Sequence, residues 1–229
     1  MILPEFGKDE TDIKEYMSRV LTDMAKGVVK AGASWLVPGS SPFISILDEL
    51  RSGEYQRRFE DFQEKVDEQL RMIKDVQLQQ LKDNQMFATV MYIAGQLALK
   101  TNEIKRQLLA NAVVNSPSCT LSEDSVVIML NCIEKYSLRH LRVLRFMQNP
   151  KEYQKRDYYM TTSTMQIYYD YYSNDNEALD RIIVRDLESD GMITSGSLFG
   201  MASVDGCFEK KTTKLGDSMI EFFGIDKDS

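Results

Sequence analysis

The chain has 229 residues, of which 43% are hydrophobic and 28% are charged, so it is long enough to bury a core and too apolar for wholesale disorder. Its formal net charge of −7 lacks the basic excess expected of a nucleic-acid-binding protein. The three cysteines, Cys119, Cys132 and Cys207, show no CxxC spacing, which argues against a disulfide framework or a zinc site and favours a reducing, cytoplasmic compartment.

The first predicted helix covers residues 9–37, where apolar side chains recur at steps of three and four along one face. Its last turns, residues 25–37, are rich in small residues and leave two interpretations open. Small residues allow close packing between helices of a bundle. The apolar end of the segment, Trp35, Leu36 and Val37, is also typical of a helix that contacts a membrane surface.

Two long helices are predicted next, over residues 55–80 and 87–108. In both segments the apolar positions alternate at steps of four and three, which is typical of an antiparallel helical hairpin with a coiled-coil-like seam. The seam also contains polar residues such as Gln69 and Thr101, so we expect further helices to cover it. Residues 1–116 are therefore predicted to form a helical bundle built around this hairpin.

The run Asn115-Ser116-Pro117-Ser118 marks the predicted boundary of a second domain, which covers residues 120–229. Thr120 and Glu123 have the spacing of a capping box, which predicts a helix from there to about Lys135.

Three more helices are predicted in the second domain. One covers residues 138–148, and a second begins near Ser163. Asn174 and Glu177 form another potential capping box, from which a third helix runs to Gly191.

The elements that follow the third helix carry a resemblance. A turn at Asp205-Gly206 within a short hairpin is predicted, and a last amphipathic helix begins near Thr213. From Leu121 onward, this order of elements resembles the MarR class of winged-helix transcription regulators. The resemblance implies a winged-helix-like α+β domain whose third helix would enter the DNA major groove.

The charges on the third helix oppose that role, because contact with phosphates demands basic residues. Acidic residues outnumber arginines there: Glu177, Asp180, Asp186, Glu188 and Asp190 against Arg181 and Arg185.

A second resemblance covers roughly residues 50–150. The runs 102–106 and 109–116, followed by the leucine-rich run 137–144, are similar to a pattern in uncharacterised bacterial helical proteins. This resemblance implies a bacterial or phage-related source and assigns no functional residue.

Six tyrosines of the second domain form three adjacent pairs and are candidate interface residues: Tyr158, Tyr159, Tyr168, Tyr169, Tyr171 and Tyr172. Neighbours on a helix point about 100° apart, so both members of a pair cannot enter one core. The cluster therefore indicates a domain core, a protein interface or a stacking surface for single-stranded nucleic acid.

No catalytic, cofactor or metal site is predicted. His140 is the only histidine and lies among leucines and arginines of a predicted helix, where a structural role is expected. The chain carries no Walker loop, GxGxxG, GxSxG or HExxH motif.

We therefore expect a mainly α, non-enzymatic, cytoplasmic protein that serves as an interaction or regulatory module. Its partner would be another protein or a second copy of itself, bound through the tyrosines or the third helix. One alternative is a winged-helix regulator that contacts DNA through the clustered Lys210, Lys211 and Lys214. The other is a membrane-active effector of bacterial defence that inserts its first helix.

Overall fold

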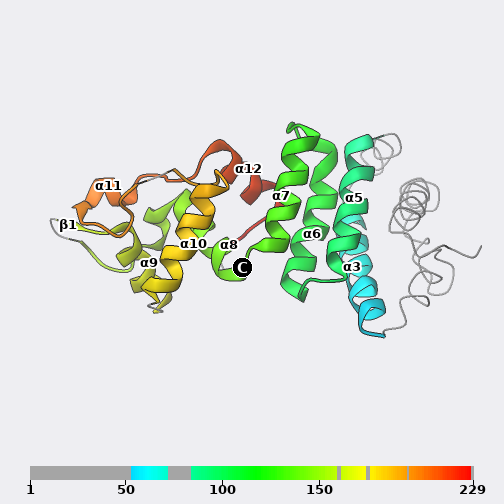
Figure 1. Ribbon diagram of the computed structural model, residues 1–229, viewed down its shortest axis with the longest axis horizontal. Helices are drawn as coiled ribbons and strands as arrows, with labels where there is room; N and C mark the ends of the chain where they lie inside the picture. Colours follow the sequence, from blue (N-terminus) through cyan, green and yellow to red (C-terminus); the bar gives the residue numbers. More distant parts are fainter. Residues whose placement is uncertain (1–52, 72–83, 159–160, 174–175, 195, 228–229) are drawn as a thin grey trace, which may run out of the picture. The chain divides into compact units, whose positions relative to one another are not determined.

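The computed structural model describes residues 53–71, 84–158, 161–173, 176–194 and 196–227. They belong to two compact units, Met1–Glu134 and Lys135–Ser229 (Figure 1). The described residues are mainly helical and contain one two-stranded antiparallel sheet, which confirms the mainly α fold. The division between the units follows Glu134, whereas the expected boundary was at Asn115–Ser118.

The described part of the first unit consists of helices. They are α3 (Gly53–Arg71), α5 (Gln85–Ala98), α6 (Glu103–Asn115), the 3₁₀ helix η2 (Ser116–Ser118) and α7 (Glu123–Lys135). Helix α3 packs chiefly against α6, and α5 packs against both. Tyr55, at the start of the predicted seam, is 39% exposed, and the polar seam residue Gln69 is half-buried. The other apolar seam residues of α3 and α5 are buried and form much of the core of this unit: Phe59, Phe62, Val66, Phe87, Val90, Ala94 and Leu97.

The segment 87–108, predicted as one helix, is instead divided between α5 and α6. Asn102 begins the new helix, because its side chain accepts a hydrogen bond from the Lys105 amide at 3.0 Å. The break shifts the helical phase, so Ile104, a predicted seam residue, is 42% exposed while Leu108 is buried.

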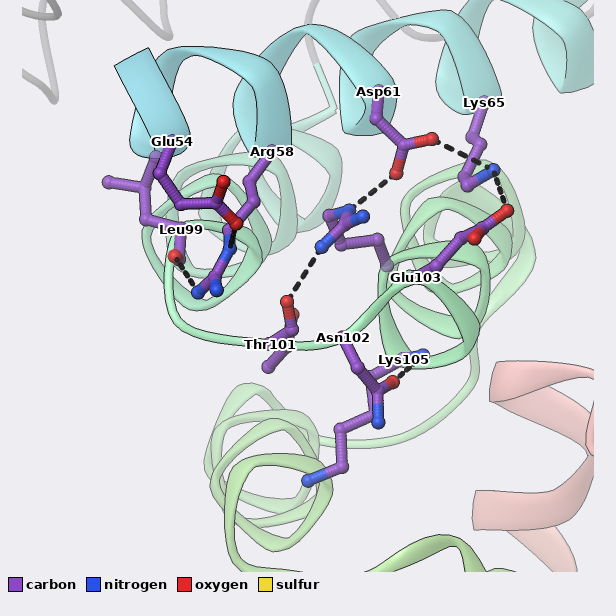
Figure 2. Close-up of polar contacts among 10 residues, drawn as sticks. Glu54, Arg58, Asp61, Lys65, Leu99, Thr101, Asn102, Glu103 and Lys105 are labelled. Atoms are coloured by element: carbon purple, nitrogen blue, oxygen red, sulfur yellow. Dashed lines mark hydrogen bonds and ion pairs between the residues drawn. The ribbon is translucent and has the colours of Figure 1, made fainter. Parts of the chain in front are cut away.

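Charged side chains of α3 hold the turn between α5 and α6 (Figure 2). Arg58 donates to the Leu99 carbonyl at 3.1 Å, where α5 ends. Asp61 forms an ion pair with Arg106, which also donates to the Thr101 carbonyl at 2.7 Å. Burial opposes ionisation of Asp61, but hydrogen bonds from Arg106 and then Lys65 outweigh it and lower the pKa of this carboxyl. The network is a structural clamp on the turn.

The start of α7 also differs from the prediction. The helix begins at Glu123, and the Ser122 hydroxyl, not Thr120, accepts a hydrogen bond from the Ser125 amide at 3.3 Å. The Glu123 carboxylate accepts from the Thr89 hydroxyl of α5 at 3.0 Å. In a capping box the Glu123 carboxylate would accept from the backbone of the cap residue. Here it accepts from Thr89 of α5 instead.

The second unit contains short helices around α8. Its elements are α8 (Leu138–Gln148), η3 (Pro150–Tyr153), β1 (Thr161–Thr162), α9 (Thr164–Tyr172), α10 (Glu177–Ser189), β2 (Ala202–Ser203), α11 (Val204–Phe208) and α12 (Lys214–Phe223). Helix α8 packs against α10, α12 and η3. It provides the largest share of the core, with Leu141, Val143, Leu144, Phe146 and Met147 buried.

Several predicted helix ends of this unit are confirmed. Ser163 caps α9 by accepting from the Gln166 amide, and Thr213 caps α12 by accepting from the Gly216 amide. Helix α10 ends just before Gly191, whose φ of 72° lies in the left-handed region that glycine tolerates.

Other predicted details of this unit are wrong. Asp205 and Gly206 lie inside α11 and form no hairpin turn, because the Ser203 hydroxyl caps a helix there. Strand β2 pairs instead with β1, which precedes α9, and a single antiparallel bridge joins Ile193 to Thr212. Helix α10 is capped by Asn176, whose side chain accepts from the Leu179 amide at 3.3 Å, two residues after the predicted cap Asn174.

Candidate functional site

The candidate tyrosines lie in an aromatic cluster of the second unit. Tyr168 is buried, and Tyr158, Tyr169, Tyr171 and Tyr172 are half-buried. Tyr159 lies outside the described residues. The 100° angle between neighbours predicts that some of these rings face solvent or a partner, and four of the five described rings are half-buried.

Tyr153 of η3 covers part of two of these rings, Tyr171 and Tyr172. Its buried ring contacts Phe146 of α8 and both Tyr171 and Tyr172 of α9, with centroids 4.9–6.1 Å apart. Burial raises the pKa of the Tyr153 hydroxyl, which is therefore neutral at physiological pH. The Tyr153 ring thus packs against both Tyr171 and Tyr172, although these neighbours point to different sides of α9.

The acidic residues of α10 differ in exposure: Glu177 is exposed, Asp186 and Glu188 are half-buried, and Asp180 faces the core. Asp180 is fully buried, and its carboxylate receives a bidentate pair of hydrogen bonds from Arg139 of α8, at 2.6 and 2.7 Å. The hydrogen bonds to Asp180 raise the pKa of Arg139. This pair joins α10 to α8 through the core.

The far end of α10 is tied down in a similar way. Asp190 accepts from the Lys135 ammonium and from the Tyr136 hydroxyl, both at 2.7 Å. Asp186 lies 3.6 Å from Nε2 of His140, whose Nδ1 accepts from the Ser137 amide and caps α8. Burial lowers the pKa of His140, so its charge contributes little at neutral pH.

Two carboxyls of the unit should make its stability acid-sensitive. Burial opposes ionisation of Asp190 and Asp217, but hydrogen bonds, chiefly from Lys135 and Lys210 respectively, hold the pKa of each below the unperturbed value of 3.8. The stabilisation is therefore present above that value and is lost as pH falls through the folded pKa. We expect Asp190→Asn to lower the free energy of unfolding at pH 7 by about 1–2 kcal/mol. The difference from wild type should be smaller at about pH 3, below the unperturbed pKa.

Thermal unfolding at both pH values measures this difference. Asp157→Asn, which removes an exposed carboxylate outside these contacts, is the control. A destabilisation by Asp190→Asn that is the same at both pH values would contradict the assignment.

The solvent-facing side of α10 carries apolar and basic side chains beside the exposed Glu177. We call Leu179, Arg181, Ile182 and Arg185 the α10 face. Leu179 is 41% and Ile182 47% exposed, while the arginine side chains are 56% and 74% exposed. Arg181 pairs with Glu177 at 2.6 Å and lies over the Phe199 ring at 4.2 Å.

Sequence reasoning missed this surface, although the signal was present. Asp180, Ile183, Val184 and Leu187 follow the steps of one buried stripe, and they are all buried. Leu179 and Ile182 lie off that stripe, which is the pattern of apolar residues left for another contact.

The three candidate lysines are unequal. Lys210 forms an ion pair with Asp217, and Lys211 donates to the Gly206 carbonyl at 2.8 Å and pairs with Glu209 at 3.6 Å. Lys214 is exposed and forms no ion pair within the described part of the chain. Two of the three ammoniums are therefore already engaged.

The remaining candidates contribute no site geometry. Trp35, Leu36 and Val37 lie outside the described residues. Of the helices in the described ranges, none is long and apolar enough to cross a bilayer. Those ranges contain no group of three or more His, Cys, Asp and Glu side chains placed to bind a metal ion, and no disulfide joins Cys119, Cys132 or Cys207 within them.

Comparison with known protein families, with characterised proteins and with solved structures found no match for this chain. The α10 face and the aromatic cluster around Tyr153 are the two features of the described residues that bear on function.

Proposed function

We propose that the protein is a non-enzymatic interaction module that binds another protein through the α10 face. One observation carries the proposal: Leu179 and Ile182 are exposed on a helix that buries its other large apolar residues, Ile183, Val184 and Leu187. Transfer of apolar side chains out of water is favourable, and an arginine beside them can donate directed hydrogen bonds. Surfaces that combine the two are typical of protein contacts. In this proposal the second unit is a winged-helix-like domain whose third helix serves protein contact, and the first unit is a helical bundle.

The side chains of the α10 face also indicate which groups a partner surface should carry. Arg185 is 74% exposed, and its nearest carboxylate oxygen, in Asp186, is 4.0 Å away. A complementary surface would place apolar side chains over Leu179 and Ile182 and a carboxylate beside Arg185.

Ile182→Glu is expected to abolish capture of this partner. Burying an unpaired carboxylate in an apolar contact is unfavourable, so we expect at least about a tenfold loss of affinity, equivalent to about 1.4 kcal/mol. The measurement is quantitative mass spectrometry of proteins that copurify from the native host, followed by titration of the purified partner; solution mass shows whether that partner is a second copy.

Ile128→Glu provides a matched control, because Ile128 is 50% exposed on α7 of the other unit. Both variants should unfold at nearly the wild-type temperature. The same copurifying proteins in equal amounts with both variants would refute the role of the α10 face.

Duplex DNA is the second candidate, and it is favoured by the inward direction of Asp180 and the exposure of Arg181 and Arg185. DNA binding through α10 would weaken with salt, and Arg185→Ala would reduce the salt slope by about one. A random-sequence selection near physiological salt that returns no site would eliminate this candidate.

A further inference from the structure

The segment after α12 places one ammonium group against the tyrosine cluster. Nζ of Lys227 lies 4.6 Å from the ring centroid of Tyr153 and 4.6 Å from that of Tyr171. The same atom donates a hydrogen bond to the Glu152 carbonyl at 2.8 Å. We call the two rings and this carbonyl the ammonium cage.

The backbone of Lys227 is held separately from its side chain. The Tyr172 hydroxyl donates to the Lys227 carbonyl at 3.0 Å. Substitutions of the Lys227 side chain therefore leave this anchor in place, and they change mainly what fills the cage.

Attraction in the cage comes from ring faces and a carbonyl dipole, without a carboxylate. Lys227 forms no ion pair within the described ranges, and the Glu152 carboxylate is engaged by Arg145 at 3.2 Å and Asn149 at 2.7 Å. A second ammonium, that of Lys155, lies 4.8 Å from the Tyr171 centroid and hydrogen-bonds to the Tyr171 carbonyl. Aromatic faces that attract a cation without a counter-ion are the chemistry by which proteins recognise alkylated ammonium groups.

We propose that the ammonium cage is a binding site for an alkylammonium group presented by a partner protein, such as a lysine side chain or its methylated form, and that Lys227 occupies it in cis. Lys227 is tethered at a high effective concentration, so it excludes a weakly binding free cation. The cage is distinct from the α10 face, and its test is independent of the proposed function.

The test uses the full chain and tetramethylammonium as the probe. We expect Lys227→Ala to bind the probe with a dissociation constant of about 1–30 mM, followed through the tyrosine ring resonances by NMR. Wild type should bind at least about tenfold more weakly, and Lys227→Arg should behave like wild type because its guanidinium still fills the cage.

A second change locates the bound probe. Adding Tyr171→Leu to Lys227→Ala should remove binding while circular dichroism remains that of the folded protein. Equal binding by wild type and Lys227→Ala would overturn the proposal, and so would binding that persists without the Tyr171 ring.

Discussion

Asp180→Ala is expected to lower the free energy of unfolding of the second unit by about 3–5 kcal/mol, because it leaves the Arg139 charge in a largely buried position without its partner. Asp180 is fully buried and the Arg139 side chain is 16% exposed, so solvent compensates little. Arg139 also lies 6.0 Å from the Tyr168 centroid, and α9 should therefore loosen together with α8 and α10. Urea unfolding monitored by far- and near-ultraviolet circular dichroism measures the loss.

Glu177→Ala is the matched control on the same helix. Its ion pair with Arg181 is more than half exposed on both sides, so its removal should change stability by less than about 0.5 kcal/mol. Replacing both Arg139 and Asp180 by apolar residues should destabilise less than Asp180→Ala alone, since no unpaired charge remains. A double variant as unstable as Asp180→Ala would show that the buried charge is not the cause.

Gly216→Ala is expected to destabilise the same unit by about 3 kcal/mol, at the upper end for an overpacked core. A β-carbon at Gly216 would lie 2.1 Å from the Met192 carbonyl oxygen and 3.4 Å from the Leu144 side chain. The Met192 carbonyl is held in place because it accepts from the Thr213 amide at 3.0 Å. Glycine to alanine in a helix ordinarily stabilises by about 1 kcal/mol, so the sign of the effect tests the close approach directly.

Gly196→Ala is the control for this change, since a β-carbon there meets nothing within 4 Å. It should be neutral or slightly stabilising through the loss of unfolded-state entropy. Thermal unfolding of the two variants decides the matter. Gly216→Ala at or above the wild-type melting temperature would mean that α12 does not approach Met192 so closely.

The α10 face shows where sequence reasoning about function reached its limit. The composition of α10 correctly indicated an excess of acids, but the direction of each acid depends on partners elsewhere in the chain. Asp180 points inward because Arg139, 41 residues earlier, supplies both hydrogen bonds. Asp190 is neutralised by Lys135, which is 55 residues away. The number of acidic residues on α10 therefore did not show which of them are exposed to solvent.

The tyrosine cluster depended on tertiary contacts in the same way. The angle between neighbours on a helix correctly implied that α9 directs its rings to different sides. What receives those rings comes from other elements, namely Phe146, Tyr153 and Lys227. The ammonium cage could not be predicted from spacing, because its ring faces and its cation lie more than 50 residues apart in the chain.

The sequence by itself determined the mainly α class and those helix ends that depend on local hydrogen bonds. Ser163, Thr213 and Gly191 end or begin helices through contacts with their own neighbours, so their residue types were sufficient. The break at Asn102 and the helix at Asp205 and Gly206 also have local caps, from Asn102 and Ser203, which sequence reasoning missed. Only the tertiary structure decided the inward turn of Asp180 and the contact of Glu123 with Thr89. Local preferences there are small, about 1 kcal/mol or less, whereas burial and long-range ion pairs contribute several kcal/mol. The larger, non-local terms therefore set the surface that α10 presents to a partner.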